Sequence, residues 1–306
     1  MKIAIIGNGA WGSALGQLSR RRGHATKVWG RHPQTNECAN LKETLRDAEL
    51  ILFAVPSHAM REVCLEVKSY LPKESLLVSM AKGIEQDTDL RMTEVIGEAT
   101  KKNKTAVISG PGFAEEVARG LPCAVVCAAA KEEWAKEVQR AFNGEDFRVY
   151  TSTDVIGVEL GGSLKNVMAI AAGVCAGIGL GESALATLIT RGLVELSRIG
   201  TALGGESQTF FGLSGVGDLV LTCSSTQSRN HQVGERLGRG ESLEHILSSL
   251  HGTAEGVKTA RSIHQILQKK NFEAPILQEV FSILYEGKPP REAVKSLMTR
   301  EPKREF

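Results

Sequence analysis

Apolar residues follow two different patterns along the chain. Up to about residue 150, short apolar runs alternate with stretches in which apolar residues recur every three or four positions. The short runs predict buried strands, and the periodic stretches predict helices. Strands that alternate with helices are typical of a parallel sheet covered on both faces. The expected strands are 2–6, 26–29, 50–55, 76–80, 106–109, 124–128 and 147–150, with helices over 59–70 and 131–142 among those between them.

Beyond residue 153 the strand pattern stops and helical periodicity continues. Asp154 is a typical N-cap residue and predicts the start of a long helix. The change of pattern predicts two domains, 1–152 and 153–306, and a length of 306 residues agrees with two domains of ordinary size. We therefore expect an α/β domain followed by an all-α domain. Further helices are expected over 184–203, 232–237, 243–250, 257–269, 275–285 and 291–298, joined by glycine-rich loops.

The first expected strand leads directly into a glycine turn. Gly7, Gly9 and Gly12 follow it in the sequence GNGAWG, and a helix is expected to begin there. The first glycine permits the sharp turn, the second lets a pyrophosphate approach the backbone, and the third lets helix and strand pack closely. The helix N-terminus adds free N–H donors and a partial positive charge. Glycine turns also occur without any ligand, but the strand before and the helix after this one favour a Rossmann-type dinucleotide site.

The end of the second expected strand bears on the choice of cofactor. An NAD-selective site carries an acidic residue there, which binds the ribose 2′-hydroxyl and repels a 2′-phosphate. This chain has Gly30, Arg31 and His32 instead. Because arginine pairs well with phosphate, we expect NADP to be accepted and favoured over NAD. The alternative is an exposed arginine without a ligand.

Composition narrows the class of protein. The 37 Lys and Arg residues nearly balance the 35 Asp and Glu residues, so the net charge of +2 gives no sign of a nucleic-acid partner. No signal peptide is recognisable and the cysteines form no CxxC pair, so we expect reduced, buried thiols in a cytoplasmic protein. The cysteines are Cys38, Cys64, Cys123, Cys127, Cys175 and Cys223.

A single charge, Lys165, stands in the long apolar stretch 160–181. The stretch is long enough to cross a bilayer, but it holds six glycines and lacks a flanking basic cluster, so we expect a helix buried inside the protein. A lone ammonium there must pair with an acid or line a polar cavity, because its burial is very costly. Burial would also lower its pKa toward neutrality, as a proton donor or acceptor requires. The alternative is a structural salt bridge.

Other polar residues lie where open α/β sheets bind ligands, beyond the carboxyl ends of the strands. Lys82 follows one such end and would project into the cleft, although a lysine on a surface loop is equally compatible with the sequence. The Gly-Pro-Gly turn 110–112 follows another end and opens a helix whose N–H groups would face an anionic substrate.

Two motifs in the second half also carry chemistry. Asp218 stands in a glycine-rich apolar run, and a buried carboxylate there would need a cationic partner, for which Lys165 is the obvious candidate. The triplet Ser228-Arg229-Asn230 suits a phosphate, with a helix cap followed by a solvated arginine as the alternative.

Together these segments resemble the NAD(P)-dependent glycerol-3-phosphate dehydrogenases of the bacterial type. The resemblance extends over nearly the whole chain, and its motifs occur in the family's order. It implies a Rossmann-type dinucleotide-binding domain followed by a helical domain like that of 6-phosphogluconate dehydrogenase. The motifs are GNGAWGSAL, AVPSHAMREV, MAKGIE, SGPGFAEEVARGLP, GVELGGSLKNVMAIAAG, LITRGL, GLSGVGDLVLTC, SRNHQVG and GTAEGVKTA.

The resemblance implies a reaction and the residues that perform it. The enzyme would reduce dihydroxyacetone phosphate to sn-glycerol 3-phosphate with NAD(P)H, with Lys165 as the general acid and, in reverse, the base. Lys82 and Asp218 complete the implied catalytic set, Asp218 by orienting Lys165. The implied substrate-binding residues are Lys82, Gly110, Gly112, Lys165, Asn166, Asp218, Ser228, Arg229 and Asn230. The implied cofactor-binding residues are Gly7, Gly9, Ala10, Trp11, Gly12, Arg31, His32, Lys82, Ala114, Arg229 and Glu255.

The resemblance also implies a biological setting. It indicates a cytoplasmic homodimer that supplies glycerophospholipid synthesis and needs no metal, nucleic acid or membrane insertion. Two other functions stay open from the sequence alone. One is a related two-domain hydroxyacid or ketoacid reductase, and the other is a nucleotide-binding regulator with weakened catalysis.

The sequence departs from the family pattern at three places. The segment between Arg31 and Ala48 is clearly shorter than in the family, which leaves the nucleotide affinity and the 2′-phosphate preference open. Gly112 stands where the family usually has a serine, so one hydroxyl is removed from the substrate pocket. Glu182 and Ser183 replace an acid-Asn or similar pair near the cleft. These departures are compatible with weakened activity.

Overall fold

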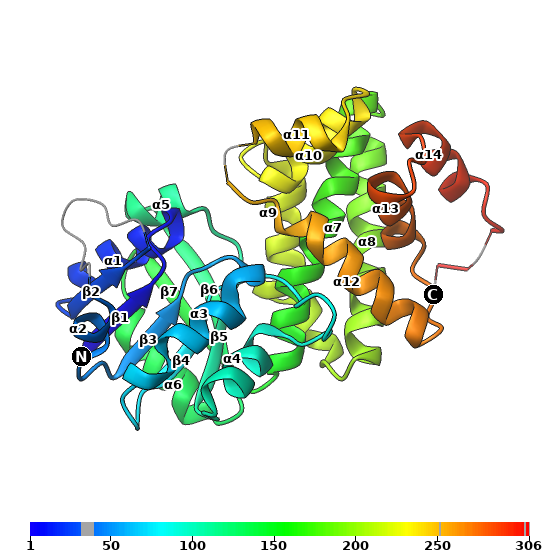
Figure 1. Ribbon diagram of the computed structural model, residues 1–306. Coiled ribbons are helices and arrows are strands. Elements are labelled where there is room, and N and C mark those ends of the chain that lie inside the picture. Colours follow the sequence, from blue (N-terminus) through cyan, green and yellow to red (C-terminus); the bar gives the residue numbers. More distant parts are fainter. Residues whose placement is uncertain (32–39, 251, 303, 306) are drawn as a thin grey trace.

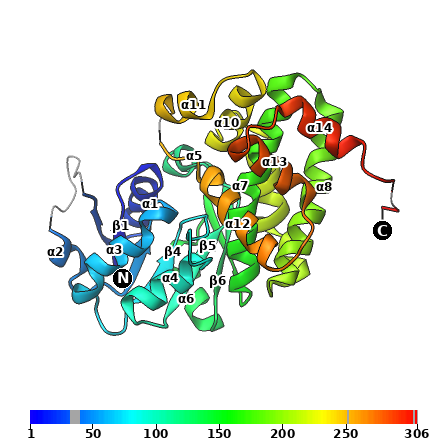
Figure 2. The same ribbon diagram turned by 45° about the vertical axis from the view of Figure 1, so that its right-hand side comes forward.

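The computed structural model describes residues 1–31, 40–250, 252–302 and 304–305. The predicted cofactor residue His32 and the predicted thiol Cys38 lie outside these ranges. Within the described residues every strand lies before residue 153, and helix α7, Val155–Ile178, begins a part built from helices. Figure 1 and Figure 2 show these two parts side by side, with α7 close to where they meet.

The first part is built on a seven-stranded sheet with the order β2-β1-β3-β4-β5-β6-β7. Every strand expected from the sequence is present, and its ends differ from the expected ones by at most two residues. The strands are β1 Lys2–Ile6, β2 Ala25–Trp29, β3 Leu50–Phe53, β4 Leu76–Ser79, β5 Thr105–Ser109, β6 Cys123–Ala129 and β7 Phe147–Ser152.

The expectation of a parallel sheet is wrong for one pair of strands. β6 runs antiparallel to β5, whereas the other neighbouring strands pair in parallel. A parallel neighbour needs a crossover of a dozen or more residues, usually with a helix that carries the chain back along the sheet. The connection from β5 to β6 contains only the short helix α5, Ala114–Ala118, which cannot span the sheet. This connection therefore stays at the carboxyl end of β5, and Gly110 and Gly112 lie in it.

Helices cover both faces of the sheet. Ile3 and Ile5 of β1 belong to one apolar core, while Ala4 and Ile6 belong to another, as the alternation of side chains along a strand requires. The first core includes residues of α1, Ala10–Arg21, and α6, Glu132–Phe142, and the second includes residues of α2, Leu41–Leu45, α3, Met60–Val67, and α4, Met92–Thr100. The expected helix 59–70 is α3 with a 3₁₀ turn at each end, Ser57–Ala59 and Lys68–Tyr70.

Helix α7 forms the centre of the second part. The side chain of Asp154 caps its start by accepting a hydrogen bond of 2.8 Å from the backbone N–H of Gly157, as expected. Among the described residues α7 is the one helix long and apolar enough to cross a membrane, and 89% of its most apolar window is buried inside the protein. The surrounding helices are α8 Glu182–Ala202, α9 Asp218–Ser224, α10 Arg229–Gly238, α11 Leu243–Ser249, α12 Glu255–Lys269, α13 Pro275–Tyr285 and α14 Pro290–Met298.

Glycines allow α7 and α10 to lie in backbone contact. A Cβ atom at Gly173 of α7 would lie 2.0 Å from the backbone oxygen of His231, and one at Gly234 of α10 would lie 1.9 Å from that of Ile170. No side chain fits in these places. This close approach accounts for glycine in the apolar stretch, and it fixes α10 against α7.

The segment 213–224 is more regular than the expected glycine-rich loop. Leu213–Gly217 forms a π-helical turn that leads directly into α9, which begins at Asp218. A Cβ atom at Gly215 would lie 2.0 Å from the backbone oxygen of Phe210, and one at Gly161 of α7 would lie 2.6 Å from that of Ser214. The glycines here serve close packing rather than chain flexibility, so the loop prediction is wrong for this segment.

Candidate active site

The glycine turn has the geometry that a dinucleotide cradle requires. Gly7 has a φ of 113°, and a Cβ atom on Gly12 would lie 1.8 Å from the backbone oxygen of Gly7, so neither position accepts a side chain. α1 begins at Ala10, directly after Gly9, with no side-chain cap and no acidic residue in its first turn. A helix N-terminus left in this state favours an anionic group. The predicted residues Gly7 to Gly12 therefore fit the pyrophosphate of a dinucleotide.

Three charged side chains from both parts of the protein meet at the carboxyl end of β4. The carboxylate of Asp218 lies 2.9 Å from the Nζ atom of Lys165 and 2.5 Å from that of Lys82, using a different oxygen for each. The same Nζ of Lys82 donates to the backbone oxygen of Gly110 at 2.9 Å. Lys165 also donates to Oγ1 of Thr222 at 2.5 Å. The expected pairing of Asp218 with Lys165 is present, and Lys82 is not a surface lysine.

Burial controls the charge states in this cluster. Lys165 is 6% exposed and Asp218 is 1% exposed. Burial lowers the pKa of Lys165 to about 8, against the opposing attraction of Asp218 and with the help of the neighbouring Lys82. Burial alone would raise the pKa of Asp218, but the two ammonium groups outweigh it and hold that pKa below its ordinary value. The result is one carboxylate shared by two cations, one of which, Lys165, has a pKa of about 8.

Asn166 and Asn230 connect this cluster to the helices around it. Asn166 accepts a hydrogen bond of 3.0 Å from Asn230 and donates to the backbone oxygen of Lys82 at 3.3 Å. Asn230 in turn accepts from the backbone N–H of Gly256 at 2.9 Å. Both side chains are buried. They hold α7, α10 and α12 against the Lys82 loop, and their direct contact with a substrate stays a prediction.

The triplet at the start of α10 divides into two roles. Ser228 is the N-cap, and its side chain accepts from the backbone N–H of His231, which agrees with the helix-cap alternative for this residue. Arg229 is exposed, and its only hydrogen bond among the described residues reaches the backbone oxygen of Thr253 at 3.4 Å. Its guanidinium is therefore open to an anionic ligand.

A second contact joins the two parts beside Lys82. Glu255, the first residue of α12, accepts hydrogen bonds from the backbone N–H of Ser57 at 3.0 Å and from the Ser57 hydroxyl. A Cβ atom on Gly83 would lie 2.5 Å from that hydroxyl oxygen, so glycine after Lys82 keeps the space open. Ser57 lies in the loop that follows β3, and nothing in the sequence indicated its bond to Glu255. This contact places the predicted cofactor residue Glu255 at the seam.

Trp11, Gly112 and Cys123 lie together near the start of α1. A Cβ atom on Gly112 would lie 3.0 Å from the sulfur of Cys123 and 3.3 Å from the ring of Trp11. The Cys123 thiol also donates to the backbone oxygen of Pro111 at 3.1 Å. The space beside Gly112 is therefore occupied by these neighbours. Ala114, another predicted cofactor residue, begins α5 directly after this loop.

Arg31 lies beyond the carboxyl end of β2, with its guanidinium paired with Glu62 and Glu66 of α3. The sequence predicts Arg31 at the 2′-phosphate but indicates no partner for it within the protein. A hollow of about 580 Å³ also lies beside α3, and its lining residues are Asn40, Leu41, Lys42, Glu66 and Tyr70.

A buried strut ties α7 to the start of α4. Glu159 accepts hydrogen bonds from the backbone N–H of Thr93 at 2.8 Å, from its hydroxyl at 2.7 Å and from Arg91 at 2.6 Å. Burial raises the pKa of Glu159, against the opposing charge of Arg91 and the bonds from Thr93. The only sequence signal for this strut was an acidic residue within an apolar run. It fixes the helix that carries Lys165 relative to the sheet.

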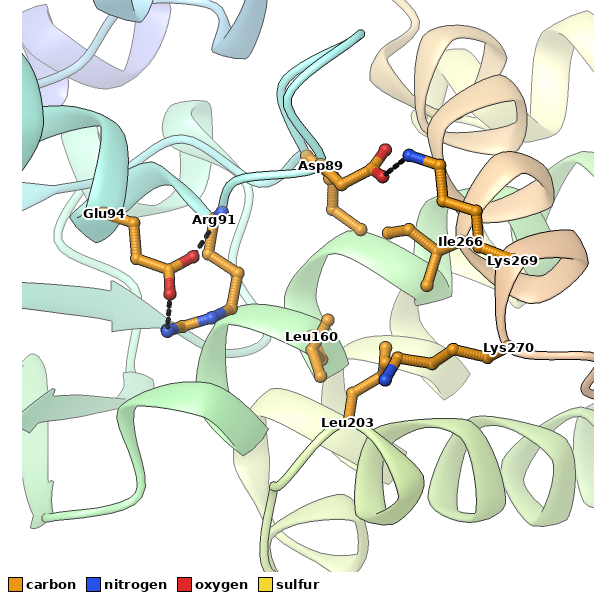
Figure 3. A pocket seen from close by; sticks show the side chains of 9 residues that line it. Asp89, Arg91, Glu94, Leu160, Leu203, Ile266, Lys269 and Lys270 are labelled. Atoms are coloured by element: carbon orange, nitrogen blue, oxygen red, sulfur yellow. Dashed lines mark hydrogen bonds and ion pairs between the residues drawn. The ribbon is translucent and has the colours of Figure 1, made fainter.

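A separate hollow of about 220 Å³ lies at the same seam (Figure 3). Asp89 and Lys269 form an ion pair across it, and Arg91 pairs with Glu94 on one wall. None of the residues that bond to Lys165 lines it, so it is distinct from the cluster at Asp218. Its lining residues are Ile84, Asp89, Arg91, Glu94, Leu160, Leu203, Ile266, Lys269 and Lys270.

Metal and disulfide chemistry find no support in the part of the chain that the structure describes. No group of three or more His, Cys, Asp or Glu side chains there is placed to hold a metal ion. The free cysteines are Cys64, Cys123, Cys127, Cys175 and Cys223. Burial raises the pKa of Cys123 to about 11 and that of Cys223 to about 12, so these thiols stay protonated at neutral pH.

Known families match both parts of the chain. Residues 154–295 match the family described as NAD-dependent glycerol-3-phosphate dehydrogenase C-terminus. Residues 2–40 and 33–135 match NAD-dependent glycerol-3-phosphate dehydrogenase N-terminus in two overlapping pieces. The two pieces overlap at 33–40, inside the segment that is shorter than in the family pattern.

Two curated relatives are both named glycerol-3-phosphate dehydrogenase (NAD(P)+). The one from Solidesulfovibrio magneticus is 46% identical over 330 residues, with 100% of each chain covered. The one from Thermoanaerobacter sp. is 43% identical over 328 residues, which cover 100% of this chain and 99% of the relative. Both alignments are longer than the 306 residues of this chain, so the relatives contain residues that this chain lacks.

Solved structures agree with this match. Glycerol-3-phosphate dehydrogenase from Coxiella burnetii superimposes with a TM-score of 0.92 at 36% identity, covering 97% of this chain and 98% of that one. D-mandelate dehydrogenase superimposes with a TM-score of 0.64 at 13% identity, covering 96% of this chain and 100% of that one. The second likeness shows a shared fold alone.

Proposed function

This chain belongs to the NAD-dependent glycerol-3-phosphate dehydrogenase family, and we propose that it reduces dihydroxyacetone phosphate reversibly to sn-glycerol 3-phosphate with NAD(P)H. The observation that carries the proposal is the buried ammonium of Lys165, which shares Asp218 with Lys82 at the seam between sheet and helices. When bound, the nicotinamide supplies a hydride to the carbonyl carbon. The remaining steps belong to side chains of this protein.

Lys165 is the proposed proton donor. Hydride addition leaves negative charge on the carbonyl oxygen, and a donor placed there lowers the barrier. Because its pKa is about 8, Lys165 is mostly an ammonium at neutral pH and yields its proton readily. In the reverse direction the neutral amine accepts the proton of the alcohol. Lys82 lies beside Lys165, and the carboxylate of Asp218 holds both nitrogens in place.

Thr222 restricts the orientation of Lys165. Its hydroxyl accepts from the ammonium at 2.5 Å and donates to Asp218 at 3.2 Å. The ammonium therefore has two fixed acceptors within the protein and one remaining proton for a ligand. This arrangement favours a single direction of proton transfer.

Arg229 is the proposed phosphate contact. It lies at the first position of α10 on the exposed rim, and it is open to an anion. Phosphate binding there would orient the carbonyl at the other end of the substrate, so that remote binding energy contributes to the reaction.

The test compares Arg229→Ala with Arg239→Ala, which removes an exposed arginine at the far end of the same helix. Arg229→Ala should raise KM for dihydroxyacetone phosphate about 10- to 100-fold, since a hydrogen bond to a charged group is lost. Unphosphorylated dihydroxyacetone should be affected much less, and Arg239→Ala should leave both values unchanged. An unchanged KM in Arg229→Ala would defeat the phosphate assignment.

A turnover assay separates this enzyme from a related reductase or a regulator. Oxidation of NADPH or NADH by the wild-type protein should require dihydroxyacetone phosphate. Simple ketoacids, the substrates of a related reductase, should give much lower rates. Nucleotide binding without turnover would favour a regulator instead.

The biological setting is also part of the proposal. The family's role implies a cytoplasmic homodimer that supplies glycerophospholipid synthesis without nucleic acid or membrane insertion. The net charge of +2 and the burial of α7 support the last two points. Sedimentation velocity tests the assembly, and a monomer at micromolar concentration would rule out a stable dimer.

A further inference from the structure

Arg31 is held by two carboxylates from another element, beyond the carboxyl end of β2. It follows the carboxyl end of β2, where the adenosine ribose of a dinucleotide lies in open α/β sheets. Its Nη2 atom donates to Glu62 at 2.8 Å and to Glu66 at 3.2 Å. These glutamates stand four positions apart on α3 and so face the same side.

Two of the three nitrogens of the Arg31 guanidinium stay unpaired in the part of the chain that the structure describes. The Nε and Nη1 atoms of Arg31 have no hydrogen-bond partner among the residues that the structure describes. The side chain is 43% exposed. A phosphate can therefore still bind at Nε or Nη1, but it has to approach within range of both glutamates.

We infer that Glu62 and Glu66 determine the cofactor selectivity of this chain by opposing the 2′-phosphate that Arg31 attracts. Arginine reads a 2′-phosphate, whereas a carboxylate accepts the 2′-hydroxyl of NAD and repels a 2′-phosphate. Here both kinds of group lie together, the cation after β2 and the acids on α3. The acid that NAD-selective sites carry after the second strand is thus supplied from a different helix.

This arrangement makes the protein accept both cofactors and lowers the NADPH preference that Arg31 alone would give. Arg31 contributes one positive charge and the two glutamates contribute two negative charges, so the trio opposes a phosphate dianion on balance. All three side chains are more than a third exposed, and water weakens their interactions. The effect is therefore a modest shift in the ratio of affinities, not an exclusion of either cofactor.

The inference rests on the proposed function, and calorimetric titration of NADPH and NADH tests it without catalysis. The double variant Glu62→Gln/Glu66→Gln should tighten NADPH binding about tenfold and leave NADH binding unchanged or weaker. Adding Arg31→Gln to that variant should abolish the gain. The matched control is Glu98→Gln, which removes an exposed carboxylate paired with Arg61 instead of Arg31.

Each outcome separates the two claims. If both nucleotides bind and their affinity ratio is the same in the wild type and the double variant, the selectivity role of the glutamates is wrong while the proposed function stands. If the ratio changes equally in Glu98→Gln, the effect is general charge and the inference is also wrong. If neither nucleotide binds the wild type, the proposed function and the inference both fail.

Discussion

Lys165 and Arg31 are both cations held by carboxylates, but their surroundings differ. Lys165 is 6% exposed and shares Asp218 with Lys82. The Arg31 side chain is 43% exposed, and the side chains of its partners Glu62 and Glu66 are 69% and 39% exposed. Burial moves the pKa of Lys165 to about 8, whereas Arg31 keeps its charge at every relevant pH. Under the proposed roles, similar ion pairing gives a proton donor in one place and a selectivity contact in the other.

The energies follow the same difference. Removing one partner of a buried ion pair costs about 3–5 kcal/mol, because the other charge is left without compensation. An exposed pair contributes about 0–1 kcal/mol. Mutations at the buried cluster should therefore change the rate and the folding stability strongly. Mutations at the exposed trio should change only the balance between two ligands.

Lys165→Met should have the largest effect. Loss of a positioned general acid should lower kcat for dihydroxyacetone phosphate reduction about 1000-fold, while the affinity for NADPH stays close to that of the wild type. Steady-state kinetics and calorimetric titration measure the two quantities. Lys165→Arg is the matched control, since it keeps the charge but cannot release a proton at neutral pH and should also be nearly inactive. High activity in either variant would refute the assignment of the proton donor.

Asp218→Asn should affect stability most. It leaves two ammonium groups without their shared counter-charge, so the free energy of unfolding should fall by about 3–5 kcal/mol. The pKa of Lys165 should also fall further, because Asp218 is the attraction that opposes burial. Urea denaturation checks the first point. Asp87→Asn, at a loop residue with positive φ and an exposed side chain, is the control and should leave the midpoint unchanged.

Thr222→Val sharpens the comparison inside the buried cluster. The valine keeps the shape but removes the acceptor of the ammonium proton, so the charged form of Lys165 is less favoured and its pKa should fall. The rate of reduction at neutral pH should decrease about tenfold. Thr222→Ser retains the hydroxyl and should behave like the wild type. Equal effects in both variants would indicate a packing role.

The smallest expected effect is a difference in salt dependence between the exposed trio at Arg31 and the buried cluster at Lys165. Raising the ionic strength from about 0.05 M to about 0.5 M screens exposed charges strongly and buried ones little. The ratio of NADPH to NADH affinity should therefore change with salt in the wild type and less in Glu62→Gln/Glu66→Gln. The pKa that governs the rate should stay in place. If salt changed the free energy of Lys165 protonation as much as the free energy that separates NADPH from NADH binding, the difference in burial would not explain the two regions.

The strands, the glycine turn and the buried charged residues could be predicted, because each depends on residues close together in the sequence. The strands follow from short apolar runs, and the glycine turn follows from Gly7 and Gly12, whose missing side chains are required by the backbone itself. Lys165 could be identified because a single charge in an apolar stretch needs a partner. Asp218 could be matched to it because it is an acid in a similarly apolar run.

The direction of a strand and contacts between residues far apart in the chain could not be predicted from the sequence. An apolar run does not encode strand direction, so the antiparallel pairing of β6 was missed. The glycines before Asp218 indicated a loop, although they serve contact with Phe210 and α7. Glu159 with Arg91 and Glu255 with Ser57 are contacts between residues far apart in the chain. Nothing in one sequence specifies such pairs.

The most direct test is the pH dependence of dihydroxyacetone phosphate reduction at saturating cofactor. The folded protein lowers the pKa of Lys165 to about 8, so its ammonium form predominates below that pH and is lost above it. As pH rises through about 8, the rate of reduction should therefore fall with the slope expected for the loss of a single proton. The rate of glycerol 3-phosphate oxidation should rise over the same range. Lys165→Met should show a low rate without this transition. A Lys165→Met enzyme that keeps the same transition at a comparable rate would contradict the account.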